Sequence, residues 1–230
     1  MLLFHTTRSI RCAPGASKTL GDTLLHHVTS SAELKRSSTV LVVTDAGILK
    51  TGIELPALQS LKDEGFDVVV YSGVEPNPPE RNVLEAVQLC KEVHAKAVVG
   101  LGGGSSLDVA KLTAFLAYPK QQQKLSEVYG VGMCRGPRLP LVQIPTTAGT
   151  GSEVTPVSII TTGENEKKGV VSSQLLPDVA LLGRFLQSVD CNRTGELTRC
   201  YRNFDRWRVD DQFTSKHHRH DRYRRHGPRH

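Results

Sequence analysis

Two short segments of this chain gather glycine and hydroxylated residues of the kinds that contact phosphate groups. The first is GGGSS at 102–106, and the second is PTTAGTGSE at 145–153. Glycine lets the backbone pass close to a ligand, and the N–H groups at the start of a helix attract an anion. The chemistry that these segments could supply is therefore the binding of a phosphate-containing ligand.

The first segment follows an apolar run, and Ser105 begins a helical pattern. Glycines followed directly by a helix start predict an anion cradle formed by Gly103, Gly104 and Ser105. A structural interpretation stays open beside it, because Ser105 and Asp108, three residues later, also fit a helix capping box. The pattern alone does not choose between the two.

In the second segment, Thr146 and Thr147 follow an apolar run directly. Ordinary turns seldom need so many small hydroxylated residues together, so a ligand contact is favoured here. Lys168 lies further along the chain and could meet a phosphate, although an exposed lysine of a hairpin is the commoner explanation for such a residue.

Two polar residues nearer the N-terminus are further candidates. Asp45 ends the run TVLVVTD at 39–45, where a carboxylate at the carboxyl edge of a parallel sheet can accept hydrogen bonds from a ribose. The same carboxylate would repel a 2′-phosphate, which favours NAD over NADP, but it could equally cap a helix that starts at position 46. Asn77 in EPNPP is either a ligand contact or a turn residue.

The elements that must position these residues are short β-branched runs that alternate with helical patterns. Such alternation predicts an α/β fold, a Rossmann-like parallel sheet covered by helices on both faces. A run VTPVSIIT and a hairpin around GENEKKG follow the second segment, and the domain is expected to end near Leu182. Strands are expected at 39–45, 67–73, 97–105 and 140–145, and helices at 55–65 and 79–95.

Charge divides the chain into two regions. Residues 183–230 hold eleven Arg and one Lys against five Asp and one Glu, which accounts for the whole formal charge of +6. Residues 1–182 balance 17 basic against 17 acidic side chains, so this region has no electrostatic preference for nucleic acid. No run reaches the roughly 18 apolar residues of a membrane helix. We therefore expect neither a specific nucleic-acid partner nor a membrane.

The segment 183–230 has no apolar periodicity and is expected to be a disordered, basic tail. Its abrupt excess of Arg over Lys predicts translation in a shifted reading frame, and a natural basic extension is the alternative. Its histidines could capture zinc or nickel, but a polar, Arg-rich strand cannot preorganise such a site, so no biological metal site is expected there. The residues concerned are His217, His218, His220, Asp221 and His226.

Cysteine usage bears on the compartment. The five cysteines form no CxxC pair, and no long apolar leader precedes the first strand, so reduced thiols and a cytoplasmic protein are expected. Residues 1–20 contain three basic residues and no acidic one. A mitochondrial transit segment is therefore the alternative.

Four motifs together resemble a known family. VTD at 43–45, PNP at 76–78, GGGSSLDVAK at 102–111 and PTTAGTGSEVTPVSII at 145–160 occur in the order and approximate spacing of the iron-containing, or group III, alcohol dehydrogenases. The resemblance covers residues 1–182. It implies the dehydroquinate synthase-like fold, in which an α/β domain binds NAD and a helical domain holds a divalent metal, iron or zinc. An alcohol or carbonyl substrate would lie between them.

The resemblance also implies roles for individual residues. Asp45 would bind the adenosine ribose, Gly103, Gly104 and Ser105 the pyrophosphate, and Thr146 and Thr147 would line the opposite wall. The full set of cofactor-binding candidates is Asp45, Asn77, Gly103, Gly104, Ser105, Asp108, Thr146, Thr147 and Lys168.

The resemblance ends after PDVALL at 177–182. There the family continues towards one Asp and three His that bind its metal, whereas this chain has Gly183 and Arg184. We therefore expect a truncated family member, an oxidoreductase by descent for an alcohol or an aldehyde or ketone, with no metal ligands and no assigned catalytic residue. The alternative is a non-catalytic nucleotide-binding module with a basic interaction tail. A homodimer is possible, as in many family members.

Overall fold

The computed structural model describes residues 6–28, 34–163 and 166–183. The chain divides into two units, Met1–Val189 and Asp190–His230, and every described residue belongs to the first. The predicted tail at 184–230, with its histidines, lies outside the described residues. The predicted domain boundary after Leu182 stays a prediction.

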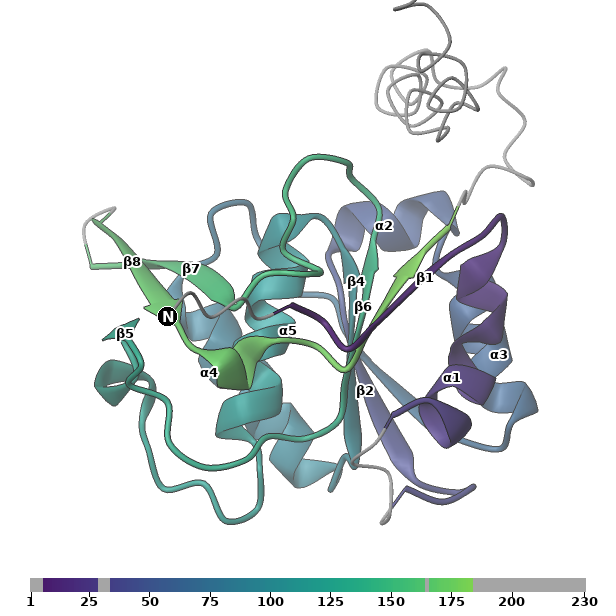
Figure 1. Ribbon diagram of the computed structural model, residues 1–230, viewed down its shortest axis with the longest axis horizontal. Coiled ribbons are helices and arrows are strands. Elements are labelled where there is room, and N and C mark those ends of the chain that lie inside the picture. The colour runs from purple at the N-terminus through teal and green to yellow at the C-terminus, as the bar shows by residue number, and fades with distance from the viewer. Residues whose placement is uncertain (1–5, 29–33, 164–165, 184–230) are drawn as a thin grey trace, which may run out of the picture. The chain divides into compact units, whose positions relative to one another are not determined.

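A six-stranded parallel sheet in the order β1-β9-β6-β4-β2-β3 forms the centre of the first unit (Figure 1). All four predicted strands are present in it, although three of them end two or three residues earlier than expected. The α/β class is therefore confirmed. The strands are β1 (Ser9–Cys12), β2 (Thr39–Val43), β3 (Asp67–Tyr71), β4 (Ala97–Gly102), β6 (Leu141–Pro145) and β9 (Val179–Leu182).

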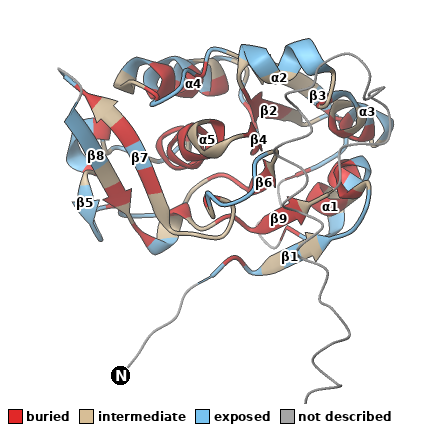
Figure 2. Ribbon diagram, turned by 90° about the horizontal axis from the view of Figure 1, so that it is seen from above, coloured by how far each residue is buried: buried red, intermediate tan, exposed pale blue. Residues whose placement is uncertain are grey.

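Helices cover both faces of this sheet, as Figure 2 shows for α4 and α5 on one face and α1 and α3 on the other. The side chains of β2 alternate accordingly. Leu41 and Val43 pack with α4 and α5, while Val40 and Val42 pack with α1 and α3. The helices are α1 (Leu20–His26), α2 (Ala46–Thr51), α3 (Leu55–Asp63), α4 (Glu80–Glu92) and α5 (Gly104–Leu116), with short 3-10 helices at Ala16–Thr19, Leu125–Glu127 and Ser173–Leu175.

A second, three-stranded sheet in the order β5-β8-β7 lies beside α5 (Figure 1). Its strands β7 (Val157–Thr162) and β8 (Glu166–Val171) form the antiparallel hairpin predicted around GENEKKG, and β5 (Gly130–Val131) pairs with β8. Within the described ranges, no helix has the length and apolar character needed to cross a membrane.

Candidate functional site

Three candidate residues meet at one edge of the large sheet. Strands β2, β4 and β6 are parallel neighbours, so Asp45, Gly103 and Thr146, which follow them, come out at the same carboxyl edge. Ligands of open α/β sheets bind at this edge. The backbone N–H of Thr146 donates to the carbonyl oxygen of Gly102 over 2.9 Å, which joins the two predicted segments directly.

Glycine is required at the turn from β4 into α5. Gly102 has a φ of 148°, and a Cβ atom there would lie 2.7 Å from Oγ of Ser106. Gly103 is the residue that caps α5, and no side chain accepts a hydrogen bond at this cap. The alternative interpretation of Ser105 and Asp108 as a capping box is therefore wrong, because the helix begins at Gly104 and both residues lie inside it. The first turn of α5 presents its N–H groups at the edge of the sheet.

The second segment lies against the start of α5. A Cβ atom on Gly104 would come within 3.3 Å of Cγ2 of Thr150 and 3.5 Å of Oγ of Ser152, and one on Gly103 would lie 3.6 Å from Oγ1 of Thr147. The absence of side chains at Gly103 and Gly104 thus lets the loop approach the helix. The two glycine-rich segments, 40 residues apart in the chain, form facing walls.

Asp45 is half-buried and adopts the capping role. Its Oδ1 accepts a hydrogen bond from the Ile48 N–H over 3.0 Å at the start of α2, which confirms the helix-cap interpretation. Its Oδ2 accepts from the Ser106 hydroxyl over 3.3 Å. Because a carboxylate offers about four lone-pair sites, these two bonds leave room for others. The ribose contact stays a prediction.

Asp108 is buried beneath the loop at 146–156 and does not lie at the surface of the protein. Its side chain forms an ion pair with Lys111, and its Oδ2 accepts from the Ile159 N–H over 3.0 Å. Burial raises the pKa of Asp108, against the lowering effect of the Lys111 charge, and burial lowers the pKa of Lys111. The predicted part of Asp108 in cofactor binding stays a prediction.

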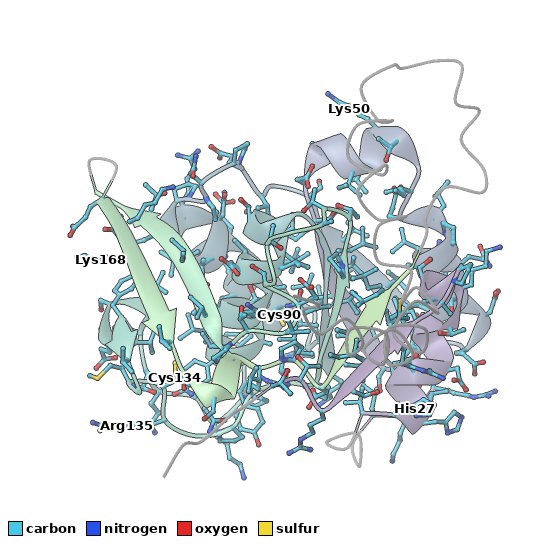
Figure 3. The ribbon with its side chains drawn as sticks, turned by 45° about the horizontal axis from the view of Figure 1, so that its top comes forward. His27, Lys50, Cys90, Cys134, Arg135 and Lys168 are labelled. Atoms are coloured by element: carbon cyan, nitrogen blue, oxygen red, sulfur yellow. The ribbon has the colours of Figure 1, made fainter. Side chains whose placement is uncertain are left out.

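Asn77 and Lys168 are held at the small sheet. Asn77 has a φ of 52°, its carbonyl oxygen accepts from the Thr161 hydroxyl over 3.0 Å, and its Oδ1 accepts from Nζ of Lys167 over 2.8 Å, so it is a turn residue. Lys168 is an exposed hairpin lysine (Figure 3), 3.5 Å from the Glu166 carboxylate and 5.8 Å from the ring centroid of Tyr129. Their cofactor contacts stay predictions.

Sequence reasoning overlooked two polar residues. Ser106, not Ser105, contacts Asp45, and Lys111 is fully buried. The sequence did contain a signal for Lys111, because this lysine follows Asp108 by three residues in a stretch of α5 (107–116) whose other residues, Thr113 excepted, are apolar. Among residues 6–28, 34–163 and 166–183, no three His, Cys, Asp or Glu side chains are grouped so that they could hold a metal ion.

Comparison with known proteins decides the family. The profile of the family described as iron-containing alcohol dehydrogenase matches residues 17–183. The chain belongs to the iron-containing alcohol dehydrogenase family. The resemblance inferred from the four motifs is thereby confirmed, and the sheet edge described above belongs to the α/β half of this family's fold.

Three family members illustrate the extent of the similarity. Choline dehydrogenase of Bacillus subtilis is 43% identical over 132 residues, which are 57% of this chain and 33% of that protein. The structure of alcohol dehydrogenase from Oenococcus oeni superposes with a TM-score of 0.71 at 31% identity, over 81% of this chain and 47% of that one. Sulfoacetaldehyde reductase from Bifidobacterium kashiwanohense, solved in complex with NAD+, gives a TM-score of 0.66 at 27% identity, over 80% of this chain and 46% of that one. This chain thus spans between a third and a half of these iron-containing alcohol dehydrogenase relatives.

Proposed function

We propose that residues 6–183 are the NAD-binding half of an NAD-dependent alcohol dehydrogenase. The observation that carries the proposal is the start of α5, where no side chain caps the helix N-terminus and the loop at 146–152 forms a facing wall. A helix start of this kind attracts phosphate through its N–H groups and its dipole. The sulfoacetaldehyde reductase complex with NAD+ supports the choice of a dinucleotide.

The residues of the two walls would divide the cofactor between them. The N–H groups of Gly104 and Ser105, in the first turn of α5, would bind the pyrophosphate. Thr146 and Thr147 stand on the opposite wall, at the end of β6, and would donate hydroxyl hydrogen bonds. A bound dinucleotide would then be fixed along the carboxyl edge of the sheet.

Asp45 would select the form of the cofactor. Its carboxylate is held by Ile48 and Ser106, so its negative charge stays at the edge of the sheet. Ribose hydroxyls can donate to its remaining lone pairs, whereas a 2′-phosphate would be repelled at close range. NAD is therefore the expected cofactor, and NADP the weaker ligand.

For the whole protein we propose oxidation of a small alcohol or reduction of an aldehyde or ketone. The cofactor, when bound, would accept the hydride as NAD in alcohol oxidation and donate it as NADH in carbonyl reduction, and this chain's residues would bind and orient it. The family's divalent metal has no matching ligand group in the described part of the chain, so no step is derived through it. Homodimer formation and a cytoplasmic location stay predictions.

Calorimetric titration of the full chain with NAD and with NADP tests this proposal. We expect saturable NAD binding and weaker NADP binding. In Gly104→Val the side chain would fill the space beside Thr150 and weaken NAD binding, while Gly169→Val, where nothing lies within 4 Å of the built Cβ atom, supplies the matched control. Absence of NAD binding by the folded wild-type chain would overturn the proposal.

A further inference from the structure

A charged pair lies inside the helix that forms the cradle. Lys111 is 0% exposed, and its Nζ is 3.4 Å from Oδ1 of Asp108. The same Nζ donates to the carbonyl oxygen of Val157 at the start of β7 over 2.6 Å. The other residues of this part of α5 are buried and mostly apolar.

Three polar groups of this pair bond to β7. The Asp108 Oδ2 accepts from the Ile159 N–H over 3.0 Å, and its backbone carbonyl oxygen accepts from the Ser158 hydroxyl over 3.0 Å. Together with the bond from Lys111 to Val157, three hydrogen bonds join α5 to one short stretch of β7. That stretch is where the loop from 146 to 156 ends.

The segments at both ends of the loop are therefore fixed, the first to the last residue of β4 and the second to α5. At its beginning, the Thr146 N–H donates to the Gly102 carbonyl oxygen, next to the start of the helix. At its far end, Oε2 of Glu153 is buried with no hydrogen-bond partner in the described part of the chain. Burial lowers the pKa of Lys111, and the negative charges of Asp108 and Glu153 oppose this shift.

Stability alone does not account for such a pair. Removing two charges from water costs several kcal/mol per ion, and apolar residues of similar volume often serve stability equally well. What a satisfied buried network supplies is one defined arrangement of the segments that it joins. Here the joined segments are the cradle helix and the wall that faces it.

We propose that Asp108 and Lys111 are positioning residues that hold the loop at 146–156 against the start of α5, so that the pyrophosphate of the cofactor meets a preformed wall. This inference rests on the proposed function. Neither residue needs to touch the cofactor, because the pair acts through Val157, Ser158 and Ile159. A preformed wall lowers the ordering cost of binding, and its loss would appear as weaker binding.

The test compares Lys111→Met with the wild-type full chain by NAD calorimetry and by hydrogen exchange of the peptides that cover 146–156. We expect NAD binding to weaken about tenfold and exchange in this loop to become faster, while peptides from β2 keep their protection. Ser158→Ala removes one of the three hydrogen bonds without leaving a buried charge. It should also weaken NAD binding and make exchange in the loop faster. If Lys111→Met does not fold, Ser158→Ala provides the test.

Arg138→Met is the matched control. Arg138 also forms a buried ion pair, with Asp178, but at the start of β6 and hence at the opposite end of the sheet. It should lower stability and leave the NAD affinity and the loop exchange of the folded protein within about twofold of the wild type. Unchanged loop exchange and NAD affinity in folded Lys111→Met or Ser158→Ala, or an equal loss in Arg138→Met, would refute the positioning role. If the wild-type chain binds no NAD, the proposed function itself fails, and the loop exchange still reports whether the pair holds the loop.

Discussion

The hydroxyl of Ser106 donates a hydrogen bond to Oδ2 of Asp45 over 3.3 Å, across 61 positions of the sequence. The bond joins the first turn of α5 to the residue that caps α2, so the proposed pyrophosphate cradle and the proposed ribose-binding carboxylate share one network. A change at either residue should therefore affect both stability and cofactor choice, and two substitutions of Asp45 separate these effects.

Asp45→Asn keeps an oxygen that can cap α2, whereas Asp45→Ala removes the cap. We expect Asp45→Ala to lower the free energy of unfolding by about 1 kcal/mol and Asp45→Asn to lower it less. Both should narrow the preference for NAD over NADP, because both remove the negative charge. Urea unfolding and parallel titrations with the two cofactors measure the effects. An unaltered preference in folded Asp45→Asn would contradict the selecting role of this carboxylate.

Gly102→Ala should be strongly destabilising. A Cβ atom there would lie 2.7 Å from Oγ and 2.9 Å from Cβ of Ser106, and the backbone has a positive φ. We expect a loss of about 2 kcal/mol or more in the free energy of unfolding, from overpacking and backbone strain together. Gly169→Ala, with open space around it, should stay within about 0.5 kcal/mol of the wild type. Equal unfolding midpoints for the two variants would contradict this prediction, because they would show that the turn at Gly102 shifts to accommodate the added methyl group.

Arg138→Met should lower the free energy of unfolding by about 3 kcal/mol, because it leaves the buried carboxylate of Asp178 without its cation. Arg138 donates to Asp178 over 2.7 Å and also to the carbonyl oxygens of Leu139 and Leu176. Arg138→Lys keeps the charge, although an ammonium group cannot make all these bonds as the planar guanidinium does. It should therefore lower the free energy of unfolding less than Arg138→Met does. Urea unfolding ranks the three proteins, and a loss below about 1 kcal/mol in Arg138→Met would argue against a stabilising pair.

Cys90 should make the protein less stable in alkali. The thiol lies on the buried face of α4, in the interior (Figure 3), and burial raises its pKa to about 12. An unfolded chain loses this proton near pH 8.5, so between that pH and 12 stability falls by up to about 1.4 kcal/mol per pH unit. The contribution is fully present below pH 8.5. Cys90→Ala should therefore show a smaller difference in unfolding free energy between pH 8 and pH 10, and an unchanged difference would count against the buried thiol as its source.

The sequence was most informative where a local pattern carries one meaning. The β-branched runs at 39–45 and 97–105 predicted parallel strands that the structure contains, since only a sheet buried on both faces tolerates continuous apolar runs. It misled where two local patterns compete. Ser105 and Asp108 have the spacing of a capping box, but the helix begins at Gly104 because the tight turn at Gly102 leads directly into it.

Residue types and their order were sufficient to predict the α/β fold, the two glycine-rich segments and the family. Short-range propensity and motif spacing are properties of the chain itself, so they can be recognised without coordinates. Only the tertiary structure showed that Asp108 faces Lys111 and β7, and that Ser106 rather than Ser105 meets Asp45. Those contacts depend on which helix face turns towards which neighbouring strand, and that is decided by packing between segments far apart in the sequence.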